Sequence, residues 1–231
     1  MGELLSQYDV LGAFWMNIKL TVLAAVGSFV IGLVLALCRI SPIGSLQKFG
    51  AAYVNIVRNT PLTIIMVIGV LGVWSQLQVQ LSSDFDFNFF LYAVACLSLY
   101  HASFVCEAIR SGVNTVPLGQ AEAARAIGLP FMDAARLVIL PQALRGAVTP
   151  LGNTLIALTK NSTVAAAASV AEVSGMMKTM MEFRPDVMVF IFCIVALGFC
   201  LIVIPIGICT TWLSDRLAVA RCCLLYTSPS P

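Results

Sequence analysis

The sequence predicts an all-α membrane protein with five transmembrane helices. Of its 231 residues, 60% are hydrophobic and only 10% are charged, and the mean hydropathy is +0.96. Soluble domains carry about 25% charged residues, so this composition indicates a membrane protein. A helix that crosses a bilayer needs about 20 mostly apolar residues. Five segments meet this length: 14–37, 51–74, 89–109, one within 144–170, and 187–213.

The positions of the cations orient the predicted bundle, because cytoplasmic loops are enriched in Lys and Arg. The loops after the first and third predicted spans are cationic, and so is the segment after the fifth span. The loop between the second and third spans has Asp84 and Asp86 and no cation. We therefore expect the N-terminus outside and the C-terminus inside. The formal net charge of +2 is too small to indicate nucleic-acid binding.

Polar residues interrupt the second and fourth predicted spans. A charge or an irregular backbone inside a membrane is tolerated where it lines a pathway or is covered by protein. Arg58 could line such a pathway or reach the headgroups with its long side chain, and Lys160 could line it or anchor its span at an interface. The predicted pathway residues are Arg58, Asn59, Thr60, Asn153, Lys160, Asn161 and Thr163.

The third predicted span carries three titratable residues. Glu107 and Arg110 are three residues apart, so they can form an ion pair across one helical turn. His101 lies deeper in the span beside Tyr100. We interpret it as a hydrogen-bonded interior histidine.

A short helix is predicted at 120–127, between Pro117 and Gly128. Proline favours the first turn of a helix, and glycine favours the left-handed position after the last turn. Ala123, Ala124 and Ile127 are predicted to share a small apolar face, and Glu122 can pair with Arg125. Such a face permits close approach of another surface, either within the protein or from a partner.

The segment 119–163 resembles the EAA signature of ABC importer permeases. The resemblance rests on residues with fixed spacings, which include Gly119, Gln120, Glu122, Ala123, Ala124, Gly128, Leu140, Pro141, Pro150, Asn153 and Lys160. The run VRNTPL at 57–62 is similar to a motif of the polar amino-acid branch, and SGVNTVPLGQAEAA looks closest to glutamate permeases.

The resemblance implies a permease subunit of a bacterial inner-membrane amino-acid importer, with glutamate or another polar amino acid as substrate. Its implied partners are a cytoplasmic ABC ATPase dimer, a second permease subunit, identical or related, and an extracytoplasmic amino-acid-binding protein. ATP and Mg would bind to the ATPase. The residues implied to dock on the ATPase are Gly119, Gln120, Glu122, Ala123, Ala124, Arg125 and Gly128.

The sequence contains no pattern for catalysis or metal binding. GxxxxGK[ST] is absent, and so are a GxSxG elbow and any Cys or His ligand spacing. We therefore predict neither an enzyme nor a bound cofactor. Two other classes stay open. A non-energised channel or secondary transporter would usually show repeated halves. A structural anchor would leave the EAA segment without a role.

We expect residues 1–221 to form one permease domain. We treat residues 222–231, with the sequence CCLLYTSPSP, as a separate tail. From Cys223 onward they look like a translated sequencing adapter rather than native protein. A native gene that encodes them would contradict this interpretation.

Overall fold

The computed structural model describes residues 8–222, which form helices joined by short turns and contain no strand. Of the predicted tail 222–231, residues 223–231 lie outside these residues. The elements are α2 (Val10–Ile40), α3 (Gly44–Arg58), α4 (Leu62–Val67), η1 (Ile68–Gln76), α5 (Phe85–Val113), α6 (Leu118–Ala126), α7 (Phe131–Ala134), η2 (Ala135–Ile139), α8 (Leu140–Asn161), η3 (Ser162–Ala168), α9 (Val173–Phe183), η4 (Pro185–Val187) and α10 (Met188–Cys222).

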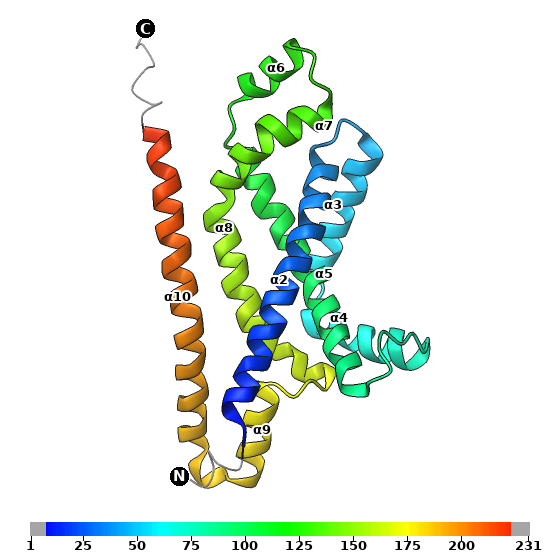
Figure 1. The fold of residues 1–231 in the computed structure, drawn as a ribbon. Coiled ribbons are helices and arrows are strands. Elements are labelled where there is room, and N and C mark those ends of the chain that lie inside the picture. The colour runs from blue at the N-terminus through cyan, green and yellow to red at the C-terminus, as the bar shows by residue number, and fades with distance from the viewer. Residues whose placement is uncertain (1–7, 223–231) are drawn as a thin grey trace.

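Helices α2, α5 and α8 form the centre of the bundle (Figure 1). Leu20 of α2, Leu97 of α5 and Leu158 of α8 are fully buried and belong to one apolar cluster. A second cluster around Leu35 and Ile109 lies nearer the opposite ends of α2 and α5. Because α5 packs against both of the other helices, it is the most enclosed long helix in this part of the chain.

Helix α10 packs along one side of the bundle against α8 and α9. Only 11% of the apolar stretch of α10 is buried inside the protein, against 61% of the apolar stretch of α5. Phe14 of α2 meets Phe199 of α10 edge to face, with ring centroids 5.6 Å apart. The remaining apolar surface of α10 is suited to lipid, which agrees with the lipid-facing or packing role that its uniform hydropathy predicts.

Three predicted spans correspond to long apolar helices. The expected segments 14–37, 89–109 and 187–213 lie within α2, α5 and the candidate span Pro185–Leu217. Each is long and apolar enough to cross a membrane, and the bent pair α3 and α4–η1 could supply a fourth crossing.

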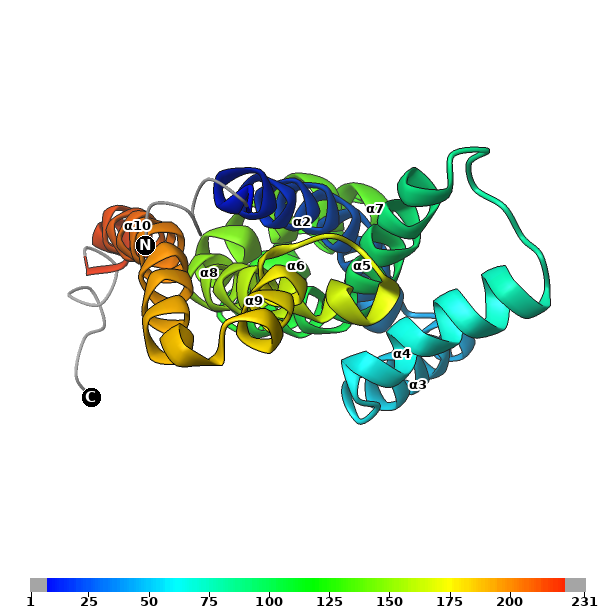
Figure 2. The same cartoon turned by 90° about the horizontal axis from the view of Figure 1, so that it is seen from below.

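The prediction of one helix over 51–74 is wrong. The chain bends by 101° between Gly44–Arg58 and Leu62–Gln76. Proline lacks a backbone N–H and disfavours helical geometry at the preceding residue, so α3 ends at Arg58 and α4 starts only after Pro61. Figure 2 shows α3 and α4 at one edge of the bundle and α10 at the other.

The predicted fourth span is also divided. Helix α8 ends at Asn161 and continues as the tighter helix η3 to Ala168, and Ser169 then adopts a left-handed conformation with φ of 58°. Helix α4 packs against η3, so the two interrupted segments lie side by side. The segment 144–170 does not appear among the candidate spans of the described chain, and five crossings stay a prediction.

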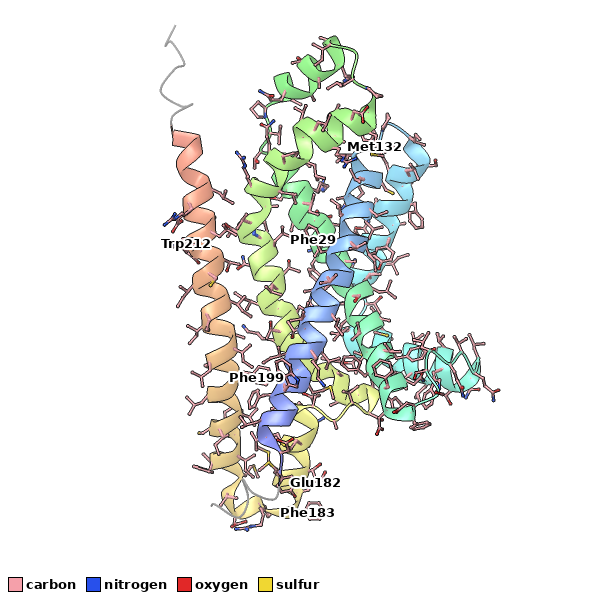
Figure 3. The ribbon with its side chains drawn as sticks, viewed as in Figure 1. Phe29, Met132, Glu182, Phe183, Phe199 and Trp212 are labelled. Atoms are coloured by element: carbon pink, nitrogen blue, oxygen red, sulfur yellow. The ribbon has the colours of Figure 1, made fainter. Side chains whose placement is uncertain are left out.

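The described chain begins and ends at opposite ends of the bundle. Helices α6 and α7 lie at the end where α10 finishes, and α9 lies at the end where α2 starts (Figure 1). In Figure 3, Met132 marks the first of these ends, and Glu182 and Phe183 mark the second.

Candidate coupling loop and translocation pathway

The residues that connect α5 to α8, 114–139, form a compact segment that we call the α6 loop. Its first helix runs from Leu118 to Ala126, one or two residues earlier than predicted. Pro117 caps this helix, and Gly128 adopts a φ of +83°. The Leu129 N–H donates to the Ala124 carbonyl at 3.1 Å. Pro117 and Gly128 therefore mark the start and the end of this helix, as predicted.

The predicted apolar face of this helix is divided in the structure. Ala124 is only 3% exposed and packs toward the rest of the chain, whereas Ala123 points to the outside. Leu118 and Ile127 are 82% and 77% exposed. Consecutive residues on a helix are about 100° apart, so the side on which α6 packs can cover Ala124 and leave Ala123 outside. Each end of α6 thus presents one large apolar side chain without cover from the described chain.

Glu122 and Arg125 form no ion pair in the described structure, which corrects the predicted pairing. Both side chains are exposed, where a pair would contribute little. Arg125 instead lines a hollow of about 450 Å³ between the α6 loop and the turn from α2 to α3, together with Gln47 and Phe131.

An ion cluster ties α2 to α5 close to the α6 loop. Glu107 accepts a hydrogen bond from Nε of Arg110 at 3.2 Å, which confirms the predicted pair. The other carboxylate oxygen of Glu107 binds the guanidinium of Arg39, a partner that sequence reasoning missed. Because Arg39 lies 68 residues earlier, no local spacing could have revealed it.

Two of the predicted pathway residues approach the same stretch of α5. The guanidinium of Arg58 lies over the ring of Phe104, 5.2 Å from its centroid. The Phe104 ring is 5.8 Å from that of His101, and Nε2 of His101 is 3.2 Å from Nδ2 of Asn161. His101 is 1% exposed, as its interior assignment predicts, but its Nδ1 has no partner in the described structure.

The other predicted pathway residues do not gather there. Asn59 and Thr60 donate to backbone carbonyls of their own helix, those of Asn55 and Ile56. Asn153 lines a separate hollow of about 240 Å³ against α10. Lys160 is exposed, and the Thr163 hydroxyl donates to its carbonyl at 2.8 Å.

A buried polar network at the opposite end of the bundle was not predicted. Asn17 of α2 donates to Ser162 at 2.9 Å and to Glu172 at 3.1 Å, and it accepts the Val173 N–H at 3.1 Å. Glu172 is fully buried and also accepts the N–H groups of Ser174 and Gly175, which caps α9. The network joins α2, η3 and α9. Its only sequence signal is an isolated Glu before a short helical segment.

Two solved structures of ABC transporters share this fold. It is similar to the crystal structure of an amino acid ABC transporter with histidines, with a TM-score of 0.76, 25% identity, and coverage of 90% of this chain and 93% of that one. An inward-facing structure of the MetNI methionine ABC transporter shares the fold, with a TM-score of 0.69. These likenesses define the fold as one that occurs in ABC transporters.

The chain belongs to the family of binding-protein-dependent transport system inner membrane components, whose model matches residues 28–219. It is 45% identical over 219 residues to the glutamate transport system permease protein GluC of Corynebacterium efficiens, which covers 92% of this chain and 96% of the relative. It is 33% identical to the probable glutamine ABC transporter permease protein GlnM of Bacillus subtilis, over 88% of this chain and 91% of that protein. The predicted family is therefore confirmed, and the chain is an inner-membrane protein.

Proposed function

We propose that this chain is the permease subunit of an ATP-driven, binding-protein-dependent importer of glutamate or another polar amino acid. Its 45% identity to a glutamate transport permease supports the substrate class. ATP and Mg would bind to a separate cytoplasmic ATPase dimer. An extracytoplasmic amino-acid-binding protein would deliver the substrate, and a second permease, identical or related, would complete the pathway.

The observation that carries ATPase docking is the exposure of most of α6, including a large apolar residue at each of its ends. Leu118 and Ile127 leave large apolar side chains uncovered on a loop that also presents Glu122 and Arg125. A short exposed helix that offers large apolar side chains together with charged ones suits a protein interaction site. The predicted docking residues Gly119, Gln120, Ala123 and Gly128 are exposed on the same segment, while Ala124 is turned inward and would support the helix.

Docking at α6 would let the ATPase bias the bundle between two arrangements. ATP would favour the arrangement in which the ATPase pair is closed, and nucleotide release would favour the other. A ligand shifts such an equilibrium only by its difference in affinity for the two states. The α6 loop connects directly to α5 and α8, so its displacement would reach both helices.

For the translocation pathway we propose Arg58, Asn59, Thr60, Asn153, Lys160, Asn161 and Thr163. Support is strongest for Arg58 and Asn161, which approach α5 through Phe104 and His101. A cation beside neutral hydrogen-bonding groups suits an amino acid with a second carboxylate. Lys160 is exposed beside this region and would face the pathway or the partner permease.

We further propose five membrane crossings with the N-terminus outside. The bent pair α3 and α4–η1 would form the second crossing, and α8 with η3 would form the fourth. The interruption of both is consistent with segments that line a pathway, since irregular backbone in a membrane needs protein or water around it. The α6 loop would then lie in the cytoplasm, where an ATPase can reach it.

Uptake of labelled glutamate into vesicles tests this function. The vesicles would hold this chain with its ATPase and its binding protein. We expect uptake that requires ATP and the binding protein. Uptake without ATP would support the alternative of a channel or secondary transporter. No uptake of glutamate, but ATP-driven uptake of glutamine or aspartate, would keep the transporter class and correct the substrate.

A further inference from the structure

The two ends of the α6 loop touch each other through their backbones. Gly112 lies in the last turn of α5, and Ala143 lies in the first turn of α8. A Cβ atom at Gly112 would overlap the Ala143 carbonyl oxygen and would lie 3.0 Å from Cβ of Ala147, whereas ordinary contacts are 3.4–4 Å. Ala143 and Ala147 are fully buried. The chain therefore leaves α5 and returns to α8 at one point of very close contact.

The C-terminal end of α5 is in contact with both α8 and α2. Gly112 contacts α8, and one turn earlier Glu107 binds Arg39 of α2. Within the loop, α6 packs against α7 and η2, and η2 continues into α8. Ala124 is buried inside this arrangement. The loop and the ends of α2, α5 and α8 thus form one packed unit rather than a loose connection.

We propose that Gly112 is a positioning residue that makes the α6 loop move α5 and α8 together. The proposal rests on the proposed function, in which an ATPase displaces α6. While the two helices stay in backbone contact, a displacement of the loop tilts both as one body. If the contact is opened, part of the displacement changes the spacing between α5 and α8 and does not reach the pathway.

The contact cannot adapt to a side chain at Gly112, because the opposing atom belongs to the backbone. Small residues allow this approach between membrane helices, and an added methyl forces the helices apart. Gly207 of α10 provides a contrast, since a Cβ there would meet Cδ1 of Ile156 of α8 at 3.7 Å, an ordinary contact. A methyl is therefore tolerated at Gly207 but not at Gly112.

The test uses the full complex in vesicles, with labelled glutamate as the probe. The variant Gly112→Ala should still co-purify with the ATPase and hydrolyse ATP, because the docking surface on α6 is untouched. Uptake per ATP hydrolysed should fall by about tenfold, which lies within the range for residues that couple distant sites. The control Gly207→Ala should keep the wild-type ratio. An unchanged ratio in Gly112→Ala would overturn the proposal.

A second variant decides the matter if Gly112→Ala does not assemble. Ala147→Val places two further methyl groups against the same crossing and should lower uptake per ATP by a smaller factor. A wild-type ratio in this variant would then overturn the proposal. Failure of the proposed function is recognised separately, since wild-type vesicles would then show no uptake that requires ATP, and the role of Gly112 would fall with it.

Discussion

Asn17 of α2 donates a hydrogen bond to the buried carboxylate of Glu172, 155 residues later in the chain, at 3.1 Å. The same carboxylate caps α9 through the N–H groups of Ser174 and Gly175. One amide side chain thus connects the first long helix to the segment that follows η3. Since both side chains are fully enclosed, every donor and acceptor of the pair must be satisfied within the protein.

Replacement of Asn17 by Ala should destabilise the folded chain by about 3 kcal/mol, because it leaves the Glu172 carboxylate and the Val173 N–H without their partner. Thr21→Val is the matched control one turn along α2, since the buried Thr21 hydroxyl has no partner in the described structure. The control should be neutral or stabilising. Thermal unfolding of the purified protein measures both, and equal effects would contradict the role of the network.

The Glu172 carboxylate should make stability depend on pH. Burial raises the pKa of Glu172 above its ordinary value, and the hydrogen bonds to Ser174, Asn17 and Gly175 only partly oppose this effect. The folded chain therefore binds this proton more tightly than the unfolded chain does. The resulting stability is present in full below the ordinary pKa of Glu and is lost as the pH rises through the raised value.

Thermal unfolding across this pH window should show a steeper loss of stability in the wild type than in Glu172→Gln, which cannot titrate. Parallel pH profiles for the two proteins would show that Glu172 has an ordinary pKa. Unfolding temperatures should be compared at each pH in one detergent and at one ionic strength.

Arg39 and Arg110 share the Glu107 carboxylate but should differ in their effect on stability. The side chain of Arg39 is 15% exposed, and that of Arg110 is 44% exposed. We expect Arg39→Met to cost about 2 kcal/mol and Arg110→Met less than about 1 kcal/mol, since water screens an exposed pair. Chemical or thermal unfolding measures the difference. A larger cost at Arg110 would reverse the proposed order.

Alanine substitutions at the two glycines of the α6 loop should have opposite effects. Gly128 needs a φ of +83°, so Gly128→Ala should strain the backbone by about 1 kcal/mol although no atom lies within 4 Å of the added methyl. Gly119 lies inside α6 with equally open surroundings, so Gly119→Ala should favour the helix by about 1 kcal/mol. Protease sensitivity of the loop should rise in the first variant and fall in the second.

Glu122→Lys should weaken association with the ATPase if α6 is the docking helix. The exposed carboxylate lies between the exposed Leu118 and Ile127 in the sequence of α6, and a change of two charge units alters complementarity without changing the fold of the chain. Co-purification with the ATPase and ATP-driven uptake should both fall. Lys178→Glu on α9, at the other end of the bundle, is the control and should leave ATPase association intact. Unchanged uptake and association in Glu122→Lys would exclude the docking assignment.

The successful predictions depend on signals that lie close together in the sequence. Helix α6 was predictable because Pro117 and Gly128 mark its two ends. The pair of Glu107 and Arg110 was predictable because three residues separate partners on one helical turn. Long apolar runs likewise located α2, α5 and α10.

What could not be predicted depends on contacts between distant segments. Pro61 indicates where the second span can break. The size of the bend, 101°, and its direction depend on how α4 packs against η3 and α5. The partner of Arg39 and the network of Asn17 join residues far apart in the chain. The division of Ala123 and Ala124 between two faces follows from the side on which α6 meets η2, which no helical spacing determines.

The contact between α4 and η3 bears on which parts of the pathway would have to rearrange internally. Both are pieces of only six or seven residues, and each is set off from its parent helix by a bend or a change of pitch. A gate made of such pieces can swing while the long helices behind it keep their packing. Internal rearrangement would then be confined to a few turns of chain, while α5 and α8 tilt as one body without repacking against each other.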